Sequence, residues 1–502
     1  MSELHPSAIS INTINPNVKL MEYAVRGPLV IRAAEIEEEL KHGVRKPFDE
    51  VIRANTGDCQ AMGQAPITYI RQVLSLALRP ELLEVVNCPS DIKERVRTLL
   101  NGCNGGSLGS YTGSLGIEFI RRYVQQFLGE RDDVPSDYRD IILTTGATQG
   151  IKSILQLLKY ERWKSNLFQI KISIFKTTAV PLVIKKTGIM VSVPQYPMYS
   201  ATIVEQGMHL VSYFLEEETN WGLNINELKR AIDEAKEVCI PRAIVIINPG
   251  NPTGQILTRA NMEEIIKFAY EENLVILADE VYQNNVYEDR IKFNSFKKVL
   301  VEMGEPYKNM ALASFMSCSK GYTGECGLRG GLVEIFNFPA DVKTMFYKSL
   351  SAQVCPNTVS QAAIFCLVNP PREGEPSYEL FMEEKTKVLK SLKERAQLVH
   401  EVFNSFEGFS CTTIQGAMYA FPQFKLPPKV IELANERGMP PDQFYAFELL
   451  ENTGVCIVPG SGFGQKPGTY HFRTTILPKI DKLKVMLEKI KSFHTDFIAK
   501  YR

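Results

Sequence analysis

The sequence predicts an α/β protein: a large domain built on a mostly parallel sheet flanked by helices, and a smaller α+β domain. Two observations support this prediction. Short runs rich in β-branched residues alternate with amphipathic segments through the middle of the chain, and five of these runs lead directly into polar or glycine-rich turns. With 502 residues, the chain is also long enough for two domains.

The predicted strands are six short apolar runs, at 140–145, 188–193, 242–248, 273–279, 310–315 and 330–336. The turns after the first five contain GATQG, PQYPMY, PGNPTG, EVYQ and MSCSKGY. Ligands of open α/β sheets bind beyond the carboxyl ends of the strands. We therefore expect these five turns to meet in one crevice.

A proline- and charge-rich stretch, PPREGEPSYELF, ends the alternating region near residue 371. We assign residues 1–100 to an N-terminal arm and part of the small domain, and residues 101–375 to the large domain. Residues 376–502 form the C-terminal small domain, which is expected to begin with a long helix over 383–405.

Composition excludes several classes of partner. Lysine plus arginine (57) balances aspartate plus glutamate (57), so no net field attracts nucleic acid. No apolar stretch approaches the roughly 20 residues that span a membrane. The ten cysteines lack metal-ligand spacing and indicate neither a metal site nor a disulfide framework. We expect a cytoplasmic protein, with a mitochondrial location left open.

A phosphate-sized feature follows the first predicted strand. The turn TTGATQG opens a helix, so that Gly146, Ala147 and Thr148 would present backbone N–H groups and a hydroxyl at its positive end. A tight turn with an N-cap explains the same residues equally well. Neither the dinucleotide fingerprint nor the Walker A pattern is present at this turn.

Two further strand ends supply an acid and an amide. Asp279 closes a predicted strand and Tyr282 follows three residues later, although a simple turn cap would also explain an acid there. NPGNPTG is more informative, because two Asn-Pro steps and two glycines specify a loop that projects the Asn251 side chain.

The run SFMSCSKGYTGECGLRGG contains one lysine, Lys320, among small residues. A lysine amine attacks carbonyl groups when burial or nearby cations destabilise its ammonium form. The small neighbours, among them Ser317, leave room for a planar cofactor, and Arg329 supplies fixed charge for a phosphate. Taken alone, Lys320 is better explained as a solvated loop residue.

Together these residues are the parts that hold pyridoxal phosphate. They provide a lysine for a Schiff base, an acid for the pyridinium nitrogen, hydroxyl and amide donors, and an arginine with a helix end for the phosphate. Their order along the chain is Thr148, Tyr196, Asn251, Asp279, Tyr282, Lys320 and Arg329. In this order and placement the chain resembles the aspartate aminotransferase superfamily of fold type I.

Local motifs narrow the resemblance to the alanine aminotransferase family. They are GQAPITYIRQVLSLALRPELL, GSLGSYTGSLGIEFIRR, PQYPMYSA, NPGNPTGQ, ADEVYQ, SKGYTGECGLRGG and YHFRTTILP, and the likeness covers nearly the whole chain except 161–187. The resemblance implies a seven-stranded sheet in the large domain, which binds pyridoxal phosphate. It also implies ping-pong transfer of the amino group from L-alanine to 2-oxoglutarate, giving pyruvate and L-glutamate.

The resemblance also implies a role for each site residue. Lys320 would hold the cofactor through a Schiff base and move the proton, and Asp279 would keep the pyridine nitrogen protonated. Tyr282 and Asn251 would hydrogen-bond the 3′-oxygen, while Tyr196 would stack on the ring. The residues expected to hold the phosphate are Ala147, Thr148, Ser317 and Arg329.

Two more residues concern the substrate and the partner subunit. Arg473, in YHFRTTI, is expected to grip the substrate α-carboxylate through two parallel hydrogen bonds, with Asn251 beside it. Taken alone, a strand arginine is more often a surface residue. Tyr111, in GSYTGS, matches a tyrosine that reaches the phosphate of the neighbouring subunit. The resemblance therefore implies a homodimer with shared active sites.

Three other functions remain open. A family member that uses glyoxylate as the acceptor has the same sequence requirements. A lyase such as an aminocyclopropane-carboxylate synthase uses the same scaffold, although the local motifs resemble that family less. A nucleotide-binding α/β protein would use the two glycine turns, but it leaves Lys320, Asp279 and Arg473 unexplained.

The stretch 161–187 interrupts the pattern, because an α/β connection usually takes about 2–6 residues. We interpret it as translated intron sequence carried by a gene model rather than as a lineage-specific surface excursion, since the residues on either side rejoin the family pattern. A chain whose fold it disrupts would be an inactive product. Peptides such as SNLFQIK or TTAVPLVIK from the natural protein would contradict the intron interpretation.

Overall fold

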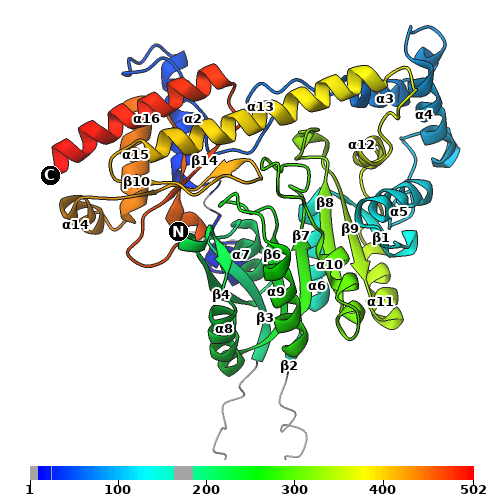
Figure 1. Ribbon diagram of the computed structural model, residues 1–502, viewed down its shortest axis with the longest axis horizontal. Helices are drawn as coiled ribbons and strands as arrows, with labels where there is room; N and C mark the ends of the chain where they lie inside the picture. The colour runs from blue at the N-terminus through cyan, green and yellow to red at the C-terminus, as the bar shows by residue number, and fades with distance from the viewer. Residues whose placement is uncertain (1–8, 24, 26, 163–184) are drawn as a thin grey trace, which may run out of the picture.

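The computed structural model describes residues 9–23, 25, 27–162 and 185–502 (Figure 1). Two parts are visible in it. We call the part built on the large sheet the sheet part; a second part, which lies across one end of that sheet, contains the long helices α13 and α16 and is called the C-terminal part. Among the helices that the structure describes, none has both the length and the apolar composition needed to cross a membrane.

Among the described residues, the large sheet has nine strands, in the order β1-β9-β8-β7-β6-β3-β4-β5, with β2 paired to β3. Strand β9 runs antiparallel to β1 and β8, whereas β8, β7, β6, β3 and β4 are parallel to one another. The bounds are β1 Ile141–Thr145, β2 Glu161–Arg162, β3 Lys185–Val193, β4 His209–Glu216, β5 Gly222–Leu223, β6 Cys239–Ile247, β7 Val275–Asp279, β8 Leu312–Ser317 and β9 Gly330–Phe336.

The predicted fold class, a mostly parallel sheet flanked by helices, is confirmed. The predicted strand count of seven is too low, because β2 and β5, two residues each, extend the sheet as short antiparallel pairs with β3 and β4. The seven longer strands account for the expected count.

Helices cover both faces of the sheet, which explains why the central strands are continuously apolar. In β6, Ala243 and Val245 pack with helices α6, α7 and α11, while Ile244 and Ile246 pack with α8, α9 and α10 on the other face. The helices of the sheet part are α3 Thr68–Leu78, α4 Ser90–Asn101, α5 Glu118–Asp132, α6 Ala147–Leu158, α7 Met198–Glu205, α8 Ile225–Val238, α9 Arg259–Glu271, α10 Phe296–Glu302, α11 Ala340–Ser351 and α12 Thr358–Val368.

The C-terminal part contains a small antiparallel sheet, β11-β14-β13, and the N-terminal residues join it. Residues from α2 through Cys59 share one apolar core with α13–α16, and Ile52 forms a β-bridge with Val455. Its elements are α2 Pro28–Lys41, α13 Tyr378–Asn404, β10 Phe409–Ser410, β11 Tyr419–Ala420, β12 Gln423–Phe424, α14 Pro428–Glu436, α15 Pro441–Thr453, β13 Val458–Pro459, β14 Phe472–Thr475 and α16 Ile480–Tyr501; the short α1, Pro16–Leu20, packs against α7.

Most of the atypical stretch 161–187, namely residues 163–184, lies outside the described residues. Its two ends meet: β2 pairs antiparallel with the start of β3, and the Tyr160 backbone N–H donates to the Thr187 hydroxyl at 2.8 Å. This junction lies at the start of β3, at the end of the sheet that faces away from the C-terminal part (Figure 1). The carboxyl ends of the parallel strands lie at the opposite end.

Candidate active site

Lys320 lies three residues beyond the end of β8 and points toward the C-terminal part. Its Nζ donates to the Gly57 carbonyl oxygen at 2.7 Å and lies 5.9 Å from the centre of the Tyr282 ring. Burial opposes the positive charge, but the acidic Tyr419, Cys326 and Cys59 side chains outweigh it, and the pKa of Lys320 is raised. The lysine therefore sits among groups that tune its proton affinity.

Asp279, the last residue of β7, is a buried carboxylate with 4% exposure. Its Oδ2 accepts a hydrogen bond from the Tyr199 hydroxyl at 2.8 Å, and its Oδ1 accepts from the Val281 backbone N–H at 3.4 Å. Burial raises the pKa of Asp279 to about 6. No lysine, arginine or histidine in the described part of the chain forms an ion pair with it, so the site lacks a cation that a protonated ring nitrogen would supply.

Arg473, on β14, is a buried guanidinium with 1% exposure. Its Nη1 donates to Asn251 Oδ1 at 3.2 Å, and its Nη2 donates to the Asn55 carbonyl oxygen at 2.6 Å. The Nε has no partner, and no carboxylate among the described residues pairs with Arg473. A buried cation without an anion is costly, which makes this a site for a carboxylate that arrives with a ligand.

Two tyrosines connect these groups. The hydroxyls of Tyr282 and Tyr419 lie 3.3 Å apart, and the guanidinium carbon of Arg473 lies 4.2 Å from the centre of the Tyr419 ring. Burial alone would raise the pKa of Tyr419, but the positive charges of Lys320 and Arg473 and a hydrogen bond from Tyr282 lower it. The proton affinity of Tyr419 therefore depends on the charges of both Lys320 and Arg473.

The start of helix α6 forms a cradle at the end of β1. Gly146 precedes it with a φ of 77°, and no side chain caps the helix, so the first N–H groups remain directed outward. The Arg329 guanidinium lies against this turn: a Cβ on Gly146 would come within 2.4 Å of its Nη2. Ala147 and Thr148 are the first helical residues, and Ser317 ends the neighbouring β8.

The remaining two predicted residues lie in different surroundings. Tyr196 is largely buried, its hydroxyl lies 3.1 Å from the Tyr23 hydroxyl, and burial raises its pKa. The side chain of Tyr111, in contrast, is 78% exposed. No hydrogen bond or ring contact joins the Tyr111 side chain to the other predicted residues, all of which the structure describes.

The structure adds residues that sequence reasoning missed. Tyr199 bonds Asp279, Tyr419 lies between the two cations, and the backbone of Asn55 and Gly57 accepts from Arg473 and Lys320. Tyr199 stands three residues after Tyr196, so helical spacing from it was an available signal. Backbone acceptors have no such signal, because any residue type supplies a carbonyl.

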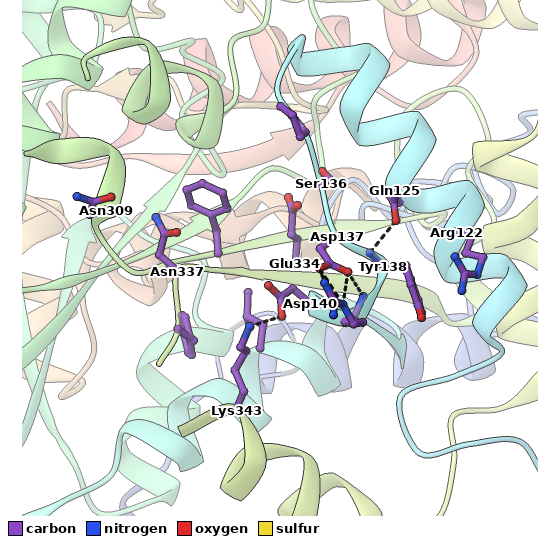
Figure 2. Close-up of a pocket in the computed structure, with 15 residues that line it drawn as sticks. Arg122, Gln125, Ser136, Asp137, Tyr138, Asp140, Asn309, Glu334, Asn337 and Lys343 are labelled. Atoms are coloured by element: carbon purple, nitrogen blue, oxygen red, sulfur yellow. Dashed lines mark hydrogen bonds and ion pairs between the residues drawn. The ribbon is translucent and has the colours of Figure 1, made fainter. Parts of the chain in front are cut away.

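A cavity of about 1050 Å³ lies at the other end of the sheet, where β1 begins and β9 ends (Figure 2). Its charged residues are already paired: Lys343 Nζ lies 2.7 Å from Asp140 Oδ1, and Arg139 forms an ion pair with Asp137. None of the predicted site residues lines it. The predicted residues other than Tyr111 gather instead near the carboxyl ends of the parallel strands and at β14 of the C-terminal part.

The residues present fit pyridoxal phosphate. A buried carboxylate without a cation, an adjacent buried lysine, and an uncapped helix start facing an arginine match its ring nitrogen, its aldehyde and its phosphate. The guanidinium of Arg473 pairs with no carboxylate among the described residues and has a free Nε, so it matches the carboxylate of an amino acid.

Comparisons with known proteins agree with this geometry. The model of the aminotransferase class I and II family matches residues 87–490. Alanine aminotransferase 1 of Homo sapiens is 48% identical over 500 residues, which cover 99% of this chain and 97% of that protein. The chain belongs to the alanine aminotransferase family. A second relative, alanine aminotransferase 2-like of Danio rerio, is 50% identical over 98% of this chain and 86% of its own.

Solved structures confirm the fold of this alanine aminotransferase family member. An alanine aminotransferase from Pyrococcus furiosus superposes with a TM-score of 0.73 at 23% identity, covering 96% of this chain and all of that one. An aminotransferase from Escherichia coli gives a TM-score of 0.72 at 21% identity and covers 98% of this chain and all of that one. The chain is thus a pyridoxal-phosphate-dependent aminotransferase of fold type I, acting on amino acids and 2-oxo acids.

Proposed function

We propose that this enzyme transfers the amino group of L-alanine to 2-oxoglutarate, giving pyruvate and L-glutamate. The names of the relatives support L-alanine as the amino donor. The observation that carries the proposal is the buried guanidinium of Arg473, which pairs with no carboxylate among the described residues and lies in the same site as Lys320 and Asp279. Every substrate and product of this reaction has an α-carboxylate that such a guanidinium can bind in a bidentate manner.

We further propose a role for each residue of the reaction centre. Pyridoxal phosphate supplies, when bound, an aldehyde that condenses with amines and a ring that accepts electrons. Lys320 takes the proton from the substrate α-carbon and returns it, because its Nζ is the buried amine of the site. Asp279 holds the proton on the ring nitrogen, with Tyr199 fixing its carboxylate. Tyr282 and Asn251 bind the ring's hydroxyl oxygen.

The remaining predicted residues anchor the cofactor. The start of α6 and the Arg329 guanidinium face each other across the turn, which is the arrangement a phosphate dianion needs. Tyr196 covers one face of the ring. The residues proposed to bind the phosphate are Ala147, Thr148, Ser317 and Arg329.

A panel of amino donors and 2-oxo acid acceptors, measured with the purified holoenzyme, tests the proposed reaction. We expect L-alanine with 2-oxoglutarate to give the highest kcat/KM, and L-alanine alone to change the visible absorption of the bound cofactor. An unchanged spectrum would contradict the proposal. Faster turnover with glyoxylate than with 2-oxoglutarate would favour the glyoxylate-dependent alternative.

Replacing Arg473 with lysine is expected to lower kcat/KM for L-alanine by about 10²-fold, mainly through KM, because a single ammonium cannot make two parallel hydrogen bonds. Steady-state kinetics on both substrates measure the change. Arg395→Lys, a change at a partly buried arginine on α13 outside the site, is the matched control. An equal loss in both variants would contradict the role of Arg473.

We propose a homodimer in which Tyr111 contacts the phosphate bound by the partner subunit; its 78% exposure in one chain supports this arrangement. Mixing Tyr111→Ala with Lys320→Ala and exchanging the subunits should recover activity that neither variant has alone, because one site of each hybrid dimer would then carry no substitution. Sedimentation shows whether dimers form. A hybrid as inactive as its parents would contradict shared sites.

The alternative of an inactive product rests on residues 161–187. The β2–β3 pair lies at the sheet end opposite the reaction centre, so we expect the stretch to leave that centre intact. Replacing 163–184 with Asn-Gly, which closes a two-residue hairpin between Arg162 and Lys185, should keep kcat/KM within about twofold of the parent. A parent without activity beside an active variant would instead favour the disrupted product.

We also propose the cytosol as the compartment. One relative, in Dictyostelium discoideum, is named a probable mitochondrial alanine aminotransferase, so the mitochondrion is the alternative. Cell fractionation with antibody detection distinguishes the two.

A further inference from the structure

Two thiols lie beside the Lys320 side chain. Lys320 Nζ donates to the Gly57 carbonyl oxygen at 2.7 Å, and Cys326 Sγ lies 3.7 Å from the same oxygen. Cys59 stands two residues after Gly57 and lies close enough to Cys326 to affect the pKa of its thiol. The backbones are close as well, because a Cβ on Gly324 would come within 2.8 Å of Cys59 Cβ and 3.3 Å of its Sγ. The two cysteines therefore form a contacting pair.

The two cysteines belong to different parts of the molecule. Cys59 is buried in the apolar core of the C-terminal part, and its Sγ lies 3.7 Å from Met418 Sδ. Cys326 belongs to the loop between β8 and β9, in the sheet part. A covalent bond between the two sulfurs would join the parts at the place where Lys320 lies.

The chemistry of the two sulfurs is unequal. A hydrogen bond from Cys59 lowers the pKa of Cys326 to about 6; burial opposes this shift and the Lys320 charge supports it. The pKa of Cys59 is raised, through the same hydrogen bond and its burial. Cys326 is partly exposed, whereas Cys59 has no exposed surface. Cys326, whose Sγ donates to the Ser319 carbonyl oxygen at 3.0 Å, is thus the accessible thiol that loses its proton more readily, and Cys59 is its buried neighbour.

We propose that Cys59 and Cys326 are an oxidation site of this enzyme, at which hydrogen peroxide closes a disulfide between the two parts of the molecule. The Cys326 thiolate attacks one peroxide oxygen, and after protonation the second oxygen leaves as water, which makes Cys326 a sulfenic acid. The Cys59 thiol then displaces the hydroxyl, which leaves as a second water. Peroxide is the two-electron oxidant, and both thiols are oxidised to one disulfide.

The disulfide changes the surroundings of Lys320. The sulfurs must approach to about 2.05 Å, which draws the Cys59 backbone and the neighbouring Gly57 carbonyl toward the loop after β8. The parts of the enzyme are then tied at one fixed separation. We expect kcat/KM to fall on the order of tenfold, because the shift of the Gly57 carbonyl oxygen, which accepts from Lys320 Nζ, displaces the amine from its position.

Peptide mapping of the peroxide-treated holoenzyme tests the site directly. Trypsin releases Cys59 in residues 54–71 and Cys326 in residues 321–329. We expect a disulfide-linked pair of these two peptides, removed by dithiothreitol together with the loss of rate. Cys59→Ala should trap the sulfenic acid of Cys326 as a dimedone adduct, and Cys326→Ala should give neither product.

Cys88→Ala, at a partly exposed cysteine elsewhere, is the matched control and should form the linked peptides like the parent. Absence of the linked peptides in the parent, or their formation through another cysteine, would overturn the assignment. Disulfide-linked enzyme with an unchanged kcat/KM would contradict the proposed effect of the disulfide on the reaction centre. The linked peptides report on the thiols alone, so this outcome does not depend on which amino acid the enzyme uses.

Discussion

Replacing Lys320 with alanine is expected to lower kcat/KM on the order of 10⁴-fold, because the variant lacks the largely buried amine proposed to move the proton. The visible absorption that comes from the lysine-linked cofactor should disappear as well, since alanine cannot condense with the aldehyde. Stopped-flow and steady-state measurements with L-alanine, together with the absorption spectrum, measure both effects.

Lys320→Arg separates the two contributions of the lysine, its charge and its amine. Arginine keeps the positive charge near Tyr419 but cannot act as a base or form the cofactor linkage. We therefore expect it to be as inactive as the alanine variant. Lys385→Ala, at a lysine 5.1 Å from the Tyr322 ring, is the matched control with retained activity. Substantial turnover by Lys320→Arg would exclude the proposed role.

Replacing Asp279 with asparagine is expected to lower kcat on the order of 10³-fold, because the amide does not hold a proton on the ring nitrogen and the ring then accepts electrons poorly. The amide keeps the size of the carboxylate and can still accept the Tyr199 hydrogen bond. Single-turnover kinetics with L-alanine isolate the chemical step. A variant with a higher KM and an unchanged kcat would show that Asp279 acts in binding alone.

For Asp279→Asn we also expect a change in how the free energy of unfolding depends on pH. Burial raises the pKa of Asp279 from 3.8 to about 6, so the folded protein binds this proton more tightly than the unfolded chain. The free energy of unfolding of the cofactor-free protein therefore falls as the pH rises from about 4 to about 6, by on the order of 3 kcal/mol from this group. Asp279→Asn should lack that part of the slope in urea titrations; an identical slope would contradict it.

The local pattern of apolar residues was sufficient to predict most strands of the large sheet. The runs that became β6, β7 and β8 are mostly apolar because helices cover both faces, and each ends in a turn that the sequence already distinguishes. Strand β4 was not predicted, because its residues alternate between buried and partly exposed positions and lack a continuous apolar run. The helix expected at 383–405 is α13, Tyr378–Asn404, and the domain boundaries at residues 100 and 375 stay predictions.

Contacts across long separations explain what the sequence could not predict in the site. Arg473 donates to Asn55, 418 positions earlier, and Tyr199 donates to Asp279 across 80 positions. The first pair depends on how the N-terminal residues pack into the C-terminal part, and the second on how α7 packs at the end of β7 within the sheet part. The motif residues were predictable because their chemistry and order are specific, whereas the groups that support them are common residue types in unremarkable surroundings.

The division of the site between two bodies makes the substrate a mechanical link. Lys320 and Asp279 belong to the sheet part, while Arg473 is carried by β14 of the C-terminal part. In the roles proposed above, a bound amino acid would be held at its nitrogen by one body and at its carboxylate by the other. A simple amine, which lacks the carboxylate, would have a partner on the sheet part alone, so under these roles an amino acid differs from an amine in joining the two bodies.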